Sequence, residues 1–427
     1  MSAAAGGRAP RPRLLFLAHL LPWPLDGGGQ IKSFHTLRIL SRRFDMTLLA
    51  FVRKKDELDA AGEAALRPLL AGPNALRTIL IPRSPAINAL SAARALRTGA
   101  SFIIGRDAVP AMREAVERTL AETNFDAVHV DHLQMAQFVP SDLAKKTRVV
   151  LDHHNIEHRI PQRLAQTPGA ANPLMRWYWK QEWPKLRDGE LAACRRCDRV
   201  LVVSDEDKDG LVALAPDLAS RLDVVPIGVD TQYFAPAQAW RHGNRTLLSI
   251  GTMFWPPNVD SMLYFCADVL PKIKARVPNV KVNIVGARPT EAVRALARHD
   301  PKTVIVTGSV PDVRPFGEDC GAFIVPLRAG SGMRVKILNA LAMGLPVVST
   351  SVGAEGIEVT NGENIVLANG TEDFADAVVR VLTEPALAEK IARGGQNLMD
   401  ARYAWDRVGE RLLDVYATIL DESAAGK

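Results

Sequence analysis

The sequence predicts an α/β protein built from two doubly wound parallel sheets. The chain has 427 residues, which is more than one hydrophobic core usually supports, so two domains of about 200 residues each are expected. Apolar, β-branched runs alternate with helical patterns, as in parallel sheets whose strands are buried on both faces. The alternation restarts once along the chain, which indicates two sheets rather than one.

Eleven runs are predicted to be strands. They cover residues 13–20, 44–52, 77–82, 125–131, 148–154 and 198–204 in the first series, and 245–251, 280–286, 304–310, 321–327 and 345–350 in the second. The seam between the series is the segment 222–236, which Pro226, Gly228 and Pro236 interrupt. The predicted domains are therefore residues 12–225 and 226–403.

Three helical regions bear on function. Ser204 is the predicted N-cap of a helix, which gives the acidic residues after it a structural explanation and leaves Asp207-x-Asp209 a weak metal candidate. The helical region 170–198 is rich in aromatic and basic residues, and we expect its rings to pack against neighbouring elements rather than lie on a membrane. The amphipathic region 88–120 is interpreted similarly, with a greater chance of flanking an acceptor site.

Charge is divided unevenly along the chain. Residues 1–200 carry a net charge of +11 and the remainder −5. A basic surface of this size could attract anionic lipid, a phosphorylated acceptor or nucleic acid, or simply be solvated. The chain has no nucleic-acid recognition motif, and no apolar run approaches 18 residues, so we expect a cytoplasmic protein with at most peripheral membrane contact and no nucleic-acid partner.

The cysteines predict packing rather than chemistry. Cys194, Cys197, Cys266 and Cys320 are too few and too scattered for a disulfide framework, which fits a reducing compartment. Cys194 and Cys197 form a C-x-x-C, but no second cysteine or histidine pair stands at zinc-finger spacing.

Four turns follow a predicted strand and precede a predicted helix, where open α/β sheets bind ligands. The first contains Gly27, Gly28 and Gly29, ahead of a helix whose free N–H groups could meet an anion or a sugar oxygen. A P-loop is excluded because Ile31, not glycine, precedes Lys32, and consecutive glycines do not fit the dinucleotide-binding spacing.

The second turn carries histidines. His154, Glu157 and His158 match H-x-x-E-H, which on a helix would place both histidines on one face, but the match is short and lacks a further ligand. We prefer an interpretation in which Asp152, His153 and His154 stand at the carboxyl end of a strand, facing a cleft between the domains. A core or surface role for either histidine stays open.

The third and fourth turns lie in the second series. Gly286 ends a strand, either for close backbone approach or for a tight turn. In the fourth turn, Gly330 and Gly332 permit unusual backbone angles ahead of a helix beginning near Met333 or Arg334. Arg334 and Lys336 add cations there, so this turn is suited to a diphosphate.

Together, these motifs resemble those of the GT-B glycosyltransferases, specifically the retaining family 4 group that uses nucleotide sugars. The resemblance rests on "PLDGGGQIKSFHTLRIL", "VVPIGVDTQYF", "LLSIGTMFWPPNVD", "VNIVGARP", "VTGSVPDVRPF" and "PLRAGSGMRVKILNALAMGLPVVSTSVGAEGI", which follow one another in family order. It implies two Rossmann-like domains facing across a cleft, with a terminal helix at 404–422 crossing back to the first domain. It also implies donor binding by the second domain and acceptor binding by the first.

The same resemblance implies a reaction that keeps the anomeric configuration, passes through an oxocarbenium-like state, and needs no metal or other cofactor. His154 is the expected catalytic histidine, with His153 close behind it, and Gly27–Gly29 form the expected acceptor or phosphate loop. Arg334 and Lys336 are expected to bind the donor diphosphate in place of a metal. The other expected donor-binding residues are Gly251, Gly286, Val310, Arg328, Gly330, Ser331, Gly332, Met333, Asn339 and Glu355.

One departure from the family bears on activity. The family usually carries Glu-x7-Glu where this chain has Ser331 and Asn339, and Arg328 or Glu355 is a candidate to assist with the sugar. The leading hypothesis is transfer from a UDP- or GDP-linked sugar to an anionic, lipid-linked or polysaccharide acceptor of the cell envelope, at the inner face of the cell membrane. The alternatives are a decayed nucleotide-sugar binding or scaffold protein and a sugar-nucleotide epimerase.

Overall fold

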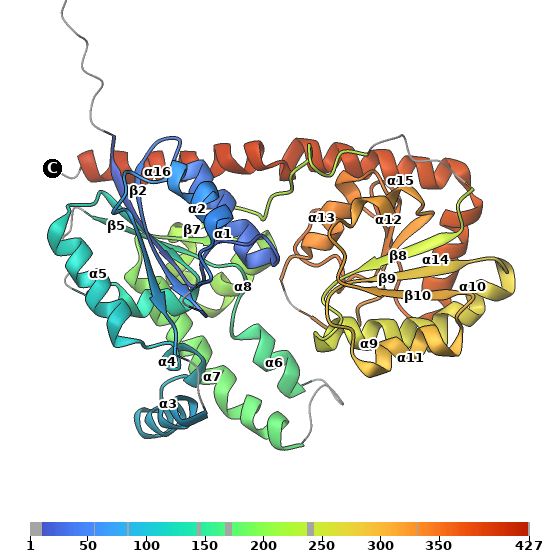
Figure 1. Ribbon diagram of the computed structural model, residues 1–427, viewed down its shortest axis with the longest axis horizontal. Helices are drawn as coiled ribbons and strands as arrows, with labels where there is room; N and C mark the ends of the chain where they lie inside the picture. Colours follow the sequence, from blue (N-terminus) through green and yellow to red (C-terminus); the bar gives the residue numbers. More distant parts are fainter. Residues whose placement is uncertain are drawn as a thin grey trace, which may run out of the picture. The chain divides into compact units, whose positions relative to one another are not determined.

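The computed structural model describes residues 11–54, 56–82, 85–141, 143, 147–166, 173–236, 243–330 and 332–425. The chain divides into two compact units (Figure 1): unit 1 is Met1–Val225 with Gly409–Lys427, and unit 2 is Pro226–Val408. Each unit contains one parallel sheet with helices between its strands. The predicted class, two doubly wound α/β sheets, is confirmed.

The unit 1 sheet has seven strands in the order β3-β2-β1-β4-β5-β6-β7. Their bounds are β1 Arg13–Ala18, β2 Asp45–Val52, β3 Leu76–Leu80, β4 Ala127–Asp131, β5 Arg148–Asp152, β6 Arg199–Val202 and β7 Leu222–Val224. The six predicted strands of this series are present. The seventh, β7, was not predicted because it is three residues long and lies within the Pro- and Gly-interrupted segment.

Helices and 3₁₀ turns connect these strands. They are α1 Gly28–Leu40, α2 Ala60–Leu66, η1 Arg67–Leu69, α3 Pro85–Thr98, α4 Phe102–Gly105, α5 Pro110–Glu122, η2 Leu133–Phe138, α6 Arg159–Gln166, α7 Pro173–Arg196, α8 Asp205–Leu214 and η3 Pro216–Arg221. Helix α8 begins as predicted, because the Ser204 side chain accepts a hydrogen bond from the Asp207 N–H. Asp207 also pairs with Arg159, which gives that carboxylate a structural role. The aromatic helical region corresponds to α7. Its rings were expected to pack against neighbouring elements, but Trp177 has 60% of its surface exposed.

The last helix, α16 (Trp405–Ala425), packs on unit 1 from Gly409 onward. Tyr416 lies against Phe44 and its hydroxyl is 2.8 Å from Nδ1 of His129, in the middle of the sheet. Arg199 pairs with Glu422 further along the helix. These contacts confirm that the terminal helix returns to the first domain.

The unit 2 sheet has six strands in the order β10-β9-β8-β11-β12-β13. Their bounds are β8 Thr246–Ile250, β9 Lys281–Val285, β10 Val304–Gly308, β11 Ala322–Val325, β12 Val347–Ser349 and β13 Val366–Leu367. The helices are α9 Pro256–Tyr264, η4 Phe265–Val269, α10 Leu270–Arg276, α11 Glu291–His299, α12 Arg314–Glu318, α13 Val335–Ala342, α14 Thr371–Thr383, α15 Pro385–Leu398 and η5 Met399–Tyr403. All five predicted strands are present; β13, two residues long, was missed.

The cysteines and the helices bear on two further expectations, cysteine chemistry and membrane crossing. Cys194, Cys197 and Cys320 are buried and all four cysteines are free, as expected for packing residues. Within the described ranges, no helix combines the length and the apolar character that crossing a bilayer requires.

Close backbone approach explains the glycine at the end of β9. Gly286 has φ +155°, and a Cβ at this position would lie 1.6 Å from the carbonyl oxygen of Gly251, at the end of β8. The neighbouring Gly308 ends β10 with φ +77°, but a Cβ there would meet nothing within 4 Å. At Gly286 a side chain is therefore excluded by a steric clash, whereas at Gly308 only the backbone conformation favours glycine.

We predict that Gly286→Ala destabilises unit 2 more than Gly308→Ala does. Gly308→Ala, the control, should lower the free energy of unfolding by about 1–2 kcal/mol, because alanine is strained in a left-handed backbone. Gly286→Ala should lower it by about 2 kcal/mol more, because the Gly251 carbonyl must also move. Denaturant unfolding followed by fluorescence measures both. Equal losses would contradict the close approach.

Candidate functional site

In unit 2, the candidate site lies where the strand order reverses. β8 pairs with β9 on one side and β11 on the other, so the connections after β8 and β11 leave the sheet in opposite directions. Open α/β sheets bind ligands at the carboxyl ends of such strands. The two connections are residues 251–255, which precede α9, and 326–334, which precede α13.

The turn before α13 brings backbone and guanidinium together. Gly332 has φ +78°, and Arg334 donates a hydrogen bond back to the Gly332 carbonyl oxygen. A Cβ on Gly330 would lie 2.3 Å from a terminal nitrogen of Arg334, so the guanidinium covers the backbone of the turn. Arg334 is the N-cap of α13 and no side chain caps this end of the helix. The predicted turn, with its helix start, is present.

Lys336 stands in the first turn of α13. Its Nζ donates to Oδ1 of Asn258, 3.0 Å away at the start of α9, so the hydrogen bond joins the two connections at the reversal. Burial, followed by the nearby Arg334 charge, lowers the pKa of Lys336 to about 7. Among the described residues, no carboxylate lies within ion-pair distance of this ammonium. A half-buried cation with only an amide partner is suited to an anionic ligand.

Most of the other predicted donor residues lie near this turn. Gly251, Gly286, Val310, Asn339 and Glu355 lie on the carboxyl-end connections of this sheet or on α13, and Met333 is buried beside them in the turn. Ser331 lies outside the described residues.

Arg328 is engaged elsewhere. It forms a two-nitrogen pair with the carboxylate of Asp260, and its guanidinium lies 4.7 Å from the ring centre of Tyr264. Its charge is therefore already balanced, which makes it a weaker candidate for the sugar.

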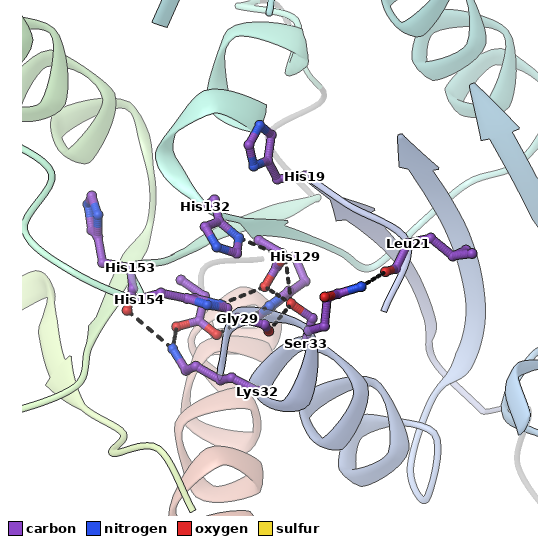
Figure 2. Close-up of polar contacts among 12 residues, drawn as sticks. His19, Leu21, Gly29, Lys32, Ser33, His129, His132, His153 and His154 are labelled. Atoms are coloured by element: carbon purple, nitrogen blue, oxygen red, sulfur yellow. Dashed lines mark hydrogen bonds and ion pairs between the residues drawn. The ribbon is translucent and has the colours of Figure 1, made fainter. Parts of the chain in front are cut away.

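In unit 1, a histidine cluster occupies the corresponding edge of the sheet (Figure 2). We use this name for Asp131, His132 and His154. The Asp131 carboxylate is 3.0 Å from Nδ1 of His132 and 2.8 Å from Nε2 of His154, and the two ring centres lie 3.7 Å apart with their planes tilted by 37°. Ser33 of α1 donates to the same carboxylate. Asp131 and His132 were not among the predicted site residues, although Asp131 ends a predicted strand and His132 directly follows it.

The two rings of the cluster differ in basicity. Burial alone would lower the pKa of His132, but Asp131 raises it above the ordinary value. Burial, followed by the His132 and Lys32 charges, lowers the pKa of His154 to about 3. The side chain of His132 is 19% exposed and that of His154 is 3% exposed. A ligand arriving from solvent would therefore meet His132 first, with neutral His154 behind it.

Lys32 fixes the glycine loop against this cluster. Its side chain is buried, pairs with Asp152 at the end of β5 and donates to the His153 carbonyl oxygen at 3.2 Å. Gly27 is the N-cap of α1, without a side-chain cap. A Cβ on Gly29 would lie 3.5 Å from Nε2 of His132. The loop Gly27–Gly29 and the histidine cluster are thus neighbours.

His153 occupies a core position instead. Its side chain points away from the cluster (Figure 2), with Nε2 3.4 Å from Sγ of Cys194 and 1% of its surface exposed. Its ring therefore faces Cys194 rather than the histidine cluster, and a catalytic role for His153 stays a prediction.

The H-x-x-E-H interpretation is also wrong as a helix. Residues 153–158 form a loop ahead of α6, and His158 pairs with Glu190 rather than sharing a face with His154.

Among the described residues of unit 1, two groups have the atoms to hold a metal ion. They are Asp131 with His132 and His154, and Asp131 with His129 and Asp152. Both carboxylates already have side-chain partners: Asp131 lies 3.0 Å from Nδ1 of His132, and Asp152 pairs with Lys32. The prediction that no metal is required stays a prediction.

Comparison with known proteins identifies the family. Residues 78–233 match the family described as Glycosyltransferase Family 4, and residues 244–384 match Glycosyl transferases group 1, so together the matches cover most of the chain. The chain belongs to these family 4 glycosyltransferases. The predicted family is therefore confirmed from both units.

Curated relatives match over part of their length. An uncharacterized 44.6 kDa protein in the cps region of Klebsiella pneumoniae is 26% identical, over 38% of this chain and 43% of that protein. The phosphatidyl-myo-inositol mannosyltransferase of Mycobacterium tuberculosis is 26% identical, over 47% of this chain and 55% of its own. The chain thus spans about half the length of these relatives.

Solved structures show the GT-B fold over nearly the whole chain. Sucrose-phosphate synthase from Thermosynechococcus elongatus has a TM-score of 0.68 at 15% identity, covering 96% of this chain and 100% of that one. Anabaena HepE in complex with UDP has a TM-score of 0.65 at 13% identity, covering 95% and 100%. At these identities the likeness confirms the predicted fold alone.

We predict that His132 titrates above its ordinary pKa of 6.5 and that Asp131→Asn lowers it, because the neutral amide leaves burial unopposed. The ring carbon-bound protons in ¹³C-histidine NMR report the titration, with His132→Gln assigning the signal. Asp107→Asn is the control, since Asp107 hydrogen-bonds His19 instead. A His132 pKa below 6.5 in the unmodified protein, or equal shifts from both aspartate changes, would refute this charge assignment.

Proposed function

We propose that the protein transfers a sugar from a nucleoside diphosphate sugar and that the start of α13 holds the diphosphate. One observation carries the proposal: Lys336 is a half-buried cation at the reversal of the unit 2 sheet, bonded to an amide rather than a carboxylate. Arg334 and the uncapped N–H groups of α13 point to the same ligand, because helix N-termini favour negative charge.

These groups suit the chemistry of the leaving group. When the bond between the sugar and the diphosphate breaks, the departing oxygen gains negative charge, and fixed cations stabilise it where water is excluded. A bound anion also raises the pKa of Lys336 from about 7, so the lysine is fully charged when the donor is present. We propose that Lys336 and Arg334 take the place that a divalent metal holds in other enzymes.

Unit 1 is the proposed acceptor side. The loop Gly27–Gly29 and the exposed edge of His132 offer N–H donors to a hydroxyl or an anionic group, and His154 supports His132 from behind. The family resemblance supports retention of the anomeric configuration. The cps-region relative and the inositol mannosyltransferase support an acceptor that is a lipid-linked or polysaccharide glycan of the cell envelope. We propose that the chain works inside the cell.

The proposal is tested with a panel of nucleotide sugars, including UDP-glucose, UDP-N-acetylglucosamine and GDP-mannose, with EDTA present. Release of UDP or GDP supports transfer, with slow hydrolysis expected when no acceptor is added. Saturable binding without release would instead support the binding-protein alternative, which Asn339 and Ser331 motivate. Conversion of the donor to an isomer would support an epimerase, and activity that needs a metal would contradict the role given to Lys336 and Arg334.

We predict that donor binding at pH 8 takes up most of a proton, because Lys336 with a pKa near 7 is mainly neutral in the free protein and charged in the complex. At pH 6 the uptake should vanish, since the lysine is already charged. Calorimetric titration with a nucleotide sugar in two buffers of different ionisation enthalpy measures the uptake.

Two variants separate charge from titration. Lys336→Met should abolish proton uptake and weaken binding by about 1–3 kcal/mol. Lys336→Arg should abolish the uptake while keeping most of the affinity, because arginine stays charged. If Lys336→Met binds the nucleotide sugar with unchanged affinity, the diphosphate does not bind at this turn.

A further inference from the structure

The large apolar side chains that are most exposed gather at one end of unit 1. Among the described residues, the four highest exposures belong to Leu96 (79%), Leu90 (73%), Leu174 (73%) and Trp177 (60%). The first two lie on α3 and the others in the first turns of α7. Scattered exposed leucines are ordinary, but a gathering of this kind indicates an interaction surface.

The sequence around α3 is basic and contains no acid. Residues 83–106 include four arginines and neither aspartate nor glutamate. Arg94, Arg97 and Arg106 line a groove of about 680 Å³ together with Ile87, Leu90 and Pro110. No carboxylate lines this groove within the described part of the chain. The groove is therefore lined by guanidinium groups and apolar side chains, and of its three arginines Arg106 also lies 3.8 Å from the carboxylate of Asp107.

The start of α7 continues the same chemistry. Arg176 and Lys180 flank Trp177 in the helix. Ser101, just after α3, donates to Glu182 of α7 at 2.6 Å, which fixes the α3–α4 segment against this helix. Both α3 and the beginning of α7 project from the same end of unit 1 (Figure 1). We call the outer side of α3 with the first turns of α7 the α3–α7 surface.

We propose that the α3–α7 surface docks on a lipid bilayer that carries anionic phospholipid. Leucine and tryptophan side chains enter the boundary between headgroups and acyl chains, and the arginines contact lipid phosphates. A symmetric contact with a second copy of the chain would set arginines against arginines, whereas an anionic bilayer neutralises them. This inference goes beyond the proposed sugar transfer and does not depend on it.

The test is flotation of the full-length protein with vesicles, without donor or acceptor. Vesicles of phosphatidylcholine alone are compared with vesicles that also contain phosphatidylglycerol. Binding is expected only to the anionic vesicles and should weaken as salt rises, because each arginine contact is screened. Equal binding to both vesicle types, or no binding to either, would overturn the proposal.

Two double variants locate the contact. Leu90→Ser with Leu96→Ser, and separately Arg94→Gln with Arg97→Gln, should each weaken vesicle binding about tenfold or more. All four side chains are exposed, so the fold should persist, and an unchanged thermal unfolding transition in circular dichroism confirms that it does.

The matched controls carry the same changes elsewhere. Arg294→Gln with Lys302→Gln removes the same charge from exposed positions of unit 2, and Leu214→Ser removes an exposed leucine of α8. Both should bind vesicles like the unmodified protein. Equally weakened vesicle binding in the charge control would show that overall charge, not the α3–α7 surface, determines binding. Dimerisation in sedimentation experiments that Leu90→Ser with Leu96→Ser abolishes would assign the surface to a second copy and contradict the bilayer.

Discussion

Parallel strands bring residues that are distant in sequence to one edge of a sheet, and both candidate sites depend on this constraint. In unit 2, Lys336 reaches Asn258 only because β8 and β11 are neighbours whose helices leave in opposite directions. In unit 1, the ends of β4 and β5 deliver Asp131 and His154, and α1 adds Ser33. The sheet order positions the polar groups, and the loops supply the chemistry.

The two sites differ in how their charges are balanced. In unit 1, Lys32 pairs with Asp152, and the carboxylate of Asp131 lies within hydrogen-bond distance of His132 and His154, so both carboxylates have side-chain partners without a ligand. In unit 2, Lys336 has an amide partner and a lowered pKa, and its ammonium form has no carboxylate partner among the described residues. An anion is the partner that such a lysine lacks. This contrast supports the proposal that the diphosphate binds to unit 2 rather than to the glycine loop of unit 1.

Much of the fold could be predicted from the sequence because buried strands produce continuous apolar runs. The strands that were missed, β7 and β13, have three and two residues, too few to produce such a run. The site was predicted less completely. His153 and His154 are adjacent, and successive residues at a strand end point in opposite directions, so the sequence could not show which one faces the core. The pairing of Arg328 with Asp260 spans 68 residues and leaves no local signal.

The central claim is that the start of α13 binds the donor diphosphate. Its most direct test is a crystal structure of the protein with UDP or GDP bound. We expect phosphate oxygens within hydrogen-bond distance of Lys336 Nζ and of the first N–H groups of α13. A diphosphate bound at Gly27–Gly29 of α1 instead, with Lys336 still bonded to Asn258 alone, would contradict the account.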